Sequence, residues 1–164
     1  MSVKSADQAA SASGDGPVQR FGWREWVALP EFGIGAIKAK VDTGARTSAL
    51  HAFEVREFTE GGVRRVAFKM HPIQRRDDLV VECVADVIDQ REVCDSGGHR
   101  EQRLVIRTPV VVGDRQWPIE ITLTGRDDML FRMLLGRTAL AGRAIVDPAA
   151  SYLVGKRPAG GHED

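Results

Sequence analysis

The chain has 164 residues, of which 43% are hydrophobic, and it carries 23 basic and 23 acidic side chains. This length allows one compact domain with its own hydrophobic core and little else. The formal net charge of zero provides no overall field toward nucleic acid, and no apolar run approaches the roughly 20 residues of a membrane helix, so neither kind of partner is expected.

The two ends of the chain differ in composition from the middle. The first residues are small and polar and lack the apolar segment of a secretory signal, so we predict a disordered tail over 1–19 and a cytoplasmic location. The folded domain is predicted over 20–155. The last residues, 156–164, are rich in Pro, Gly and charge and are expected to form a flexible tail.

Between the tails, short apolar runs separated by turn residues predict an all-β fold. We expect strands over 21–29, 34–41, 64–71, 80–89, 101–113 and 115–125. A hairpin tip is expected at Gly61–Gly62, within "EFTEGGVRR". Only "GRTALAGR", 136–143, has a helical composition, and so short a helix needs tertiary support.

The segment "VDTGA", Val41–Ala45, places a carboxylate at the end of a predicted strand whose apolar residues indicate that it is buried. A buried carboxylate costs several kcal/mol unless it is paired or hydrogen-bonded, so Asp42 requires local partners. Gly44 permits a sharp turn with an N–H near the acid, and the Thr43 hydroxyl can bond back to the backbone. On its own, the tripeptide favours an ordinary turn that carries a solvated Asp.

A second motif, "MLLGRTAL" at Met133–Leu140, changes that interpretation. The first motif, "VDTGA", resembles the active-site loop of aspartic proteases. In that fold the loop packs on two bulky residues and a Gly, followed by a short helix, and Leu134, Leu135 and Gly136 match this pattern. Together, the two motifs resemble those of retropepsins. The resemblance implies an all-β, retropepsin-like closed β-barrel half-lobe with one short helix, forming a homodimer.

The resemblance extends over about residues 26–154. "DTGARTSALHA", "FKMHP", "REVCDSGG", "RLVIRTPVVVG" and "WPIEITLTGRDDMLFRMLLGR" are similar to a bacterial retropepsin-like family. Its members carry the label ATP-dependent zinc protease and can be encoded beside a glutamate ligase that modifies a ribosomal protein. The resemblance therefore adds a possible link to glutamate chemistry.

The residues do not support the ATP and zinc in that label. No G-x-x-x-x-G-K-[ST] loop is present, and the four histidines are scattered without an H-E-x-x-H pattern. Cys83 and Cys94 have no zinc or redox spacing and are expected to be reduced thiols. We therefore predict no cofactor and no metal.

The resemblance implies a site on each chain that is one half of a two-fold active site. Its predicted residues are catalytic Asp42, Thr43 and Gly44; substrate-binding Ala45, Arg46, Thr47, Arg126 and Arg132; and the supporting Leu134, Leu135, Gly136 and Arg137. The resemblance also implies a flap that covers the bound substrate, for which the hairpin at Gly61–Gly62 is the candidate. A second Asp-Ser-Gly, at Asp95, lacks its own apolar-apolar-Gly element and is interpreted as a hairpin turn.

Arg46 departs from the viral pattern, in which acids follow DTGA. It either pairs with an acid of its own chain, such as Glu120, Asp127 or Asp128, or faces the substrate groove, where it would favour acidic, glutamate-rich peptides.

The sequence thus predicts an aspartic endopeptidase that hydrolyses peptide bonds through an Asp dyad. Two alternatives remain open: a non-catalytic β-barrel that binds a peptide or a partner, and a zinc-dependent hydrolase.

Overall fold

The computed structural model describes residues 16–74, 76–95, 97–126 and 129–154, and the structural statements below concern these residues. Most of the two predicted tails lies outside the described residues. One boundary differs from the prediction: Gln19, expected within the tail, begins a strand, and its N–H donates to the Arg143 carbonyl at 2.9 Å. The division into tails and one domain otherwise stays a prediction.

The described chain is mostly β, as predicted. Its strands are β1 (Gln19–Phe21), β2 (Arg24–Leu29), β3 (Ile34–Val41), β4 (Ser48–His51), β5 (Phe53–Glu60), β6 (Val63–Met70), β7 (Val81–Asp86), β8 (Asp89–Cys94), β9 (Arg100–Val112), β10 (Arg115–Thr124), β11 (Met133–Leu135) and β12 (Ala144–Val146). A 3-10 helix, η1 (Pro30–Phe32), and the short helix α2 (Arg137–Leu140) complete the fold. The predicted helical segment is therefore confirmed, in a shorter form.

The main sheet has seven strands in the order β10-β4-β11-β3-β2-β9-β8, and β9 also pairs with β10. The sheet is strongly curled, but β2 and β9 share a single register pair, Ala28 opposite Val111. The predicted closed barrel is wrong in this respect. Most of β9 is already paired with β10 and β8, so little of its length remains for β2.

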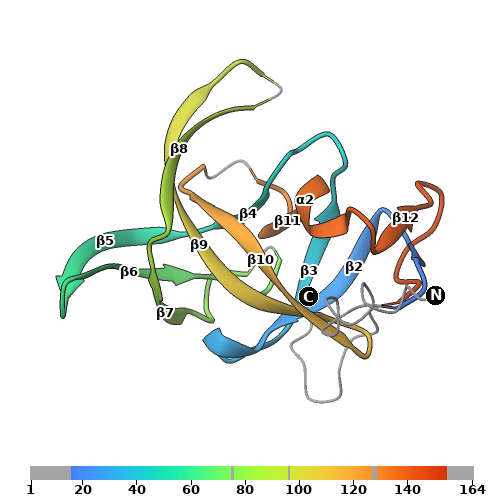
Figure 1. The fold of residues 1–164 in the computed structure, drawn as a ribbon, viewed down its shortest axis with the longest axis horizontal. Coiled ribbons are helices and arrows are strands. Elements are labelled where there is room, and N and C mark those ends of the chain that lie inside the picture. Colours follow the sequence, from blue (N-terminus) through green and yellow to red (C-terminus); the bar gives the residue numbers. More distant parts are fainter. Residues whose placement is uncertain (1–15, 75, 96, 127–128, 155–164) are drawn as a thin grey trace, which may run out of the picture.

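A separate three-stranded sheet, β5-β6-β7, extends to one side of the curled sheet (Figure 1). Its first hairpin closes where Glu60 pairs with Val63, and the two turn residues, Gly61 and Gly62, have φ values of 59° and 81°. Positive φ at both positions is the geometry of a tight two-residue hairpin turn. The hairpin tip predicted at these two glycines is confirmed.

The strand predicted over 80–89 is wrong in its extent, because two strands of different sheets occupy this segment. The Val87 N–H donates to the Arg64 carbonyl, whereas the Ile88 N–H donates to the Val105 carbonyl, both at 2.9 Å. The chain therefore leaves the β5-β6-β7 sheet at Val87 and joins the main sheet at Ile88. A continuous apolar pattern conceals this exchange of partners.

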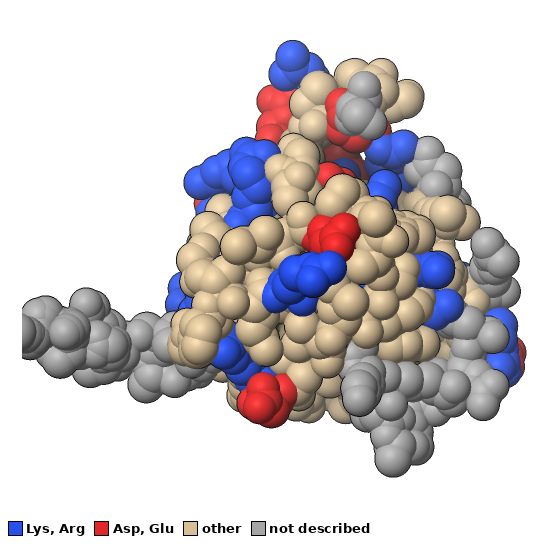
Figure 2. All heavy atoms as spheres, turned by 90° about the vertical axis from the view of Figure 1, so that its right-hand side faces the viewer, with Lys and Arg blue, Asp and Glu red and all other residues tan. Residues whose placement is uncertain are grey.

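The core lies inside the curl of the main sheet, and β11 crosses its centre between β3 and β4. Fully buried side chains from these strands and their neighbours fill it: Leu29, Ile34, Ile37, Leu50, Ile106, Ile121, Met133 and Leu135. Figure 2 shows one face of the molecule, mostly covered by uncharged residues, with charged side chains of both signs among them. In the described part of the chain, no helix has both the length and the apolar character to span a membrane.

Candidate active site

The acid loop, which we define as residues 42–47, follows the last residue of β3. The Asp42 N–H donates to the Leu135 carbonyl at 2.8 Å, and its half-buried carboxylate accepts the Gly44 N–H at 3.0 Å. The Ala45 N–H returns to the Asp42 carbonyl at 3.2 Å. The sequence predicted that the glycine would present an N–H to the acid, and the structure confirms it.

Thr43 has a different local role from the one expected. Its side chain is exposed, and no hydrogen bond of its hydroxyl is found within the described residues. Instead its carbonyl oxygen accepts a hydrogen bond from Nη1 of Arg137 at 3.0 Å. The arginine at the start of α2, rather than the threonine hydroxyl, ties down this part of the loop.

The predicted support for the loop is present behind it. Leu134 and Leu135 of β11 pair in parallel with Lys40 and Val41, so β11 continues the sheet directly beside the acid. Leu135 is fully buried, while Leu134 is half-buried. The acid therefore projects from a layer of sheet that the core holds rigid.

Gly136 allows the closest approach in the site. A Cβ atom at this position would lie 2.6 Å from the Thr47 carbonyl carbon and 2.9 Å from the Ser48 nitrogen. The Gly136 N–H donates to Oγ of Ser48 at 3.1 Å. A side chain at position 136 would push the acid loop away from β11, because backbone atoms cannot yield as a flexible side chain can.

The N-terminal turn of α2 completes the cradle. Its first two N–H groups, on Arg137 and Thr138, donate to the carbonyl oxygens of Ala45 and Arg46 at 2.8 and 3.0 Å. These orphan donors of a helix start are thus satisfied by the acid loop itself. Four predicted site segments, 42–44, 45–47, 134–136 and 137, are brought together in one hydrogen-bonded unit.

The arginines predicted to bind substrate are placed differently from one another. Arg46 is exposed, and within the described chain its side chain has no hydrogen bond or ion pair. Of the acids proposed to pair with it, Glu120 pairs instead with Arg91 at 3.0 Å, and Asp127 and Asp128 lie outside the described residues. Arg46 thus presents its charge to solvent from the acid loop.

Arg126 and Arg132 are each held by an acid elsewhere. Arg132 pairs with Asp77 at 2.9 Å, and Arg126 forms an ion pair with Asp95. Both contacts join segments that are distant in sequence, and no local pattern could have indicated them. The structure does not place these two arginines with Arg46 in the acid loop unit.

Asp95 lies in the turn between β8 and β9, so the prediction of a hairpin turn at this residue is confirmed. Its Oδ1 accepts the N–H groups of Gly97 and His99, both at 2.9 Å. Strand β8 of this hairpin could not be predicted from the sequence, because its segment "DQREVC" is mostly charged or polar and lacks the apolar alternation of a strand. The turn motif "CDSGG" was the signal that could have located it.

The residues considered for metal binding are dispersed. His51 ends β4, His71 stacks on Phe53 with ring centroids 4.6 Å apart, and His99 lies in the β8–β9 turn. Over the described ranges, no group of three His, Cys, Asp or Glu side chains is close enough to hold a metal ion. Both cysteines are free thiols, and burial raises the pKa of Cys83 to about 12.

Comparisons with known proteins extend these observations. A family model described as RimB-like, retropepsin-like aspartic endopeptidase RimB, matches residues 20–157. The chain is 43% identical over 136 residues to a Shewanella pealeana protein and 47% identical over 134 residues to one from Parasynechococcus marenigrum, both named probable alpha-L-glutamate ligase. The matches cover 83% and 82% of this chain but 30% and 29% of those proteins, so the chain spans about three tenths of their length.

A solved structure shares the fold. It is that of a Legionella pneumophila protein of unknown function, which superposes with a TM-score of 0.71 at 24% identity. The match covers 82% of this chain and 97% of the other. The overall fold is therefore shared with a second protein.

Proposed function

The chain belongs to the RimB-like family of retropepsin-like aspartic endopeptidases, and we propose that it hydrolyses peptide bonds as a homodimer. In this proposal, Asp42 of each of two chains supplies one carboxyl group of the active site. The observation that carries it is the half-buried Asp42 carboxylate, held by the Gly44 N–H on a loop that Leu135, Gly136 and Arg137 support. Such rigid placement is what proton transfer at a fixed distance requires.

The chemistry follows from the proximity of two like charges. Two carboxylates a few ångströms apart cannot both ionise easily, so one Asp42 stays protonated while the other is charged. The charged group accepts a proton from water as the water oxygen attacks the peptide carbonyl carbon, and the protonated group donates to the carbonyl oxygen. The C–N bond then breaks as the amide nitrogen takes up a proton, which releases a carboxylic acid and an amine.

Three features support assembly into a homodimer. Each chain has a single acid loop of this kind, so a dyad needs a second copy. The Thr43 side chain is exposed at the loop, where it is available to a partner loop across a two-fold axis. Large apolar side chains are exposed at the paired strands β1 and β12, namely Val18, directly before β1, and Ile145 of β12. Burial of such residues is the usual driving force for association.

The proposed substrate is an acidic, glutamate-rich peptide segment. Arg46 is exposed on the acid loop and its guanidinium has no partner among the described residues, and a guanidinium binds carboxylates in a bidentate manner. The relatives that contain a region similar to this chain are named probable alpha-L-glutamate ligase. A hydrolase that acts on glutamate-containing segments would be the chemical counterpart of such a ligase.

The experiment that tests this function is a cleavage screen with the wild type and Asp42→Asn, using acidic and neutral peptide libraries of equal length. The substitution is nearly isosteric and keeps an oxygen for the Gly44 N–H, so the fold is expected to be preserved. Wild-type cleavage that Asp42→Asn abolishes supports the proposal. Equal cleavage by both proteins contradicts it, and so does binding of peptides by the wild type without any cleavage.

A further inference from the structure

The β8–β9 hairpin, here residues 89–95 and 97–104, stands out because it has almost no apolar packing. None of the β8 side chains is buried, and among the described residues of the hairpin Arg103 alone is buried. Figure 1 shows the hairpin projecting from the main sheet at the same end of the molecule as the connection between β3 and β4. Because a hairpin of this kind gains little from the hydrophobic effect, polar contacts must fix its direction.

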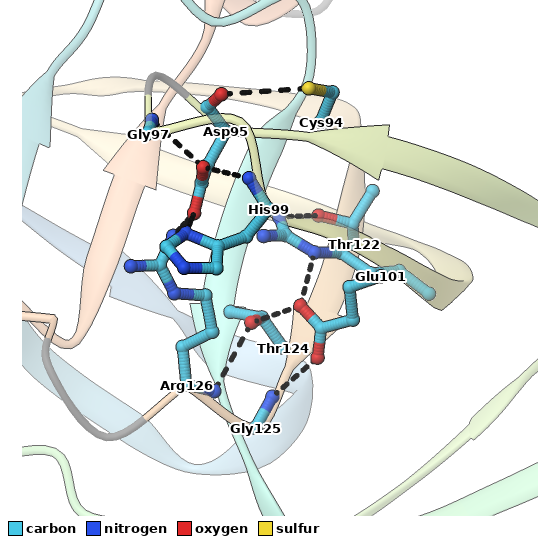
Figure 3. A network of polar contacts seen from close by, with 10 residues as sticks. Cys94, Asp95, Gly97, His99, Glu101, Thr122, Thr124, Gly125 and Arg126 are labelled. Carbon is cyan, nitrogen blue, oxygen red and sulfur yellow. Dashed lines mark hydrogen bonds and ion pairs between the residues drawn. The ribbon is translucent and has the colours of Figure 1, made fainter.

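Arg103 and Glu101 provide those contacts where the hairpin separates from β10. The last register pair between β9 and β10 joins Val105 to Thr122. Beyond it, the Glu101 carboxylate accepts Nε of Arg103 at 2.9 Å and the Thr124 hydroxyl at 2.8 Å, and it also accepts the Gly125 N–H at 3.2 Å (Figure 3). Side chains therefore continue the attachment after the backbone ladder has ended.

The same network reaches the support of the acid loop. Nη1 of Arg103 donates to Oγ1 of Thr122 at 3.3 Å, and the Thr122 hydroxyl donates to the Ser48 carbonyl at 3.1 Å. Oγ of Ser48 accepts the N–H of Gly136, the residue on which the acid loop packs. A continuous series of hydrogen bonds thus joins the base of the hairpin to the base of the acid loop.

A second attachment lies at the hairpin turn. Oδ1 of Asp95 holds the turn, while the same carboxylate forms an ion pair with Arg126, on the segment that follows β10 (Figure 3). The Arg126 N–H also donates to the Thr124 hydroxyl at 3.3 Å. Both attachments therefore converge on the segment 124–126.

We propose that Glu101 and Arg103 are positioning residues that hold the β8–β9 hairpin as the cover of the proposed peptide groove, with the Asp95–Arg126 ion pair as a second contact at its turn. The inference rests on the proposed function for its effect on cleavage. It replaces the hairpin at Gly61–Gly62 as the candidate cover, because in Figure 1 that hairpin extends away from the β3–β4 connection.

The test compares Glu101→Gln and Arg103→Lys with Glu92→Gln as a matched control. Glu92 lies in the same hairpin, but its partner Arg100 at 3.2 Å is also in the hairpin, so this substitution leaves both attachments intact. Arg103→Lys keeps the buried charge but cannot reach Glu101 and Thr122 together. Amide hydrogen exchange over 89–104 reports on the attachment, and kcat and KM on acidic peptides report on its use.

In Glu101→Gln and Arg103→Lys, we expect hairpin exchange to accelerate about tenfold or more, because each substitution weakens the contacts of the Arg103 side chain, which is only 9% exposed. KM should rise about tenfold with kcat changed less than twofold, since a cover binds substrate without touching the reacting atoms. Glu92→Gln should resemble the wild type in both measurements.

Three results would overturn the inference: unchanged exchange in both variants, faster exchange with unchanged KM, or equal changes in the Glu92→Gln control. If the wild type cleaves no peptide, the proposed function fails, and the role of the hairpin as a cover fails with it. The exchange data then still decide whether Glu101 and Arg103 attach the hairpin. The failure of the attachment and the failure of the function are therefore distinguishable.

Discussion

The acid loop and the β8–β9 hairpin are held in place by opposite means. The loop lies on buried β11, where Leu135 has no exposed surface and Gly136 lets two backbones meet. The hairpin is attached by charged side chains, and its buried residue is Arg103. Residues that pack tightly in the core are restricted to a single arrangement. A segment that is attached by polar contacts can open locally at a modest cost in free energy. A site that needs a fixed acid and a movable cover would combine these two designs.

The largest expected effect comes from a substitution at Leu135, which packs behind the acid loop. Leu135→Ala should lower the free energy of unfolding by about 2–5 kcal/mol, because it leaves a cavity directly behind the acid. Urea denaturation measures the change. Leu130→Ala is the control, since Leu130 is 62% exposed and its loss should cost little. Equal effects of the two substitutions would show that β11 does not hold the loop through packing.

A substitution at Gly136 tests the packing of the acid loop by adding atoms, whereas Leu135→Ala removes them. Gly136→Ala places a methyl group 2.6 Å from the Thr47 carbonyl carbon and should destabilise the fold by about 1–3 kcal/mol through overpacking. Gly35→Ala on the neighbouring β3 is the matched control, because nothing lies within 4 Å of its Cβ position. A thermal midpoint lowered in Gly136→Ala alone is the expected result.

Arg46 is an exposed charge on the acid loop, and its substitution tests the proposed preference for acidic peptides. Arg46→Ala should lower kcat/KM on acidic peptides about tenfold or more and leave neutral peptides nearly unchanged, because a desolvated charge contact contributes about 2–5 kcal/mol. Arg107→Ala, which removes an exposed arginine on β9, should change neither. Equal losses on both peptide classes would make Arg46 a structural residue.

The attachment of the β8–β9 hairpin should depend on pH through Glu101. Burial by itself raises the pKa of Glu101, but hydrogen bonds from Thr124, Gly125 and Arg103 outweigh it and lower the pKa below its ordinary value. The attachment is therefore complete above the ordinary glutamate pKa of about 4.3 and is lost as the pH falls through the lower folded value.

Hydrogen exchange between about pH 6 and pH 3, corrected for intrinsic rates, should show the hairpin losing protection before the acid loop. Glu101→Gln removes the titrating group and should have a flatter pH profile over the hairpin. The same profile in both proteins would assign the change to another acid, such as Asp95 at the turn.

The sequence predicts the acid loop, which depends on local packing, better than the β8–β9 hairpin, which depends on contacts between distant charges. "VDTGA" and "MLLG" could be interpreted because the constraint is local: a glycine where no side chain fits and leucines where the core requires them. Strand β8 and the partners of Arg126 and Arg132 could not be predicted, because they depend on which distant charges meet after folding. The limited pairing of β2 with β9 likewise depends on how β8 and β10 occupy β9, which no local pattern encodes.

The proposed active site requires Asp42 from two chains, and mixing two proteins tests this requirement. Wild type and Asp42→Asn are combined in varying ratios, allowed to exchange subunits, and assayed on an acidic peptide at constant total protein. If both carboxyl groups are required, activity falls with the square of the wild-type fraction, to about one quarter in an equal mixture. A linear fall to about one half would show that each chain acts alone and that the site does not need Asp42 from two chains.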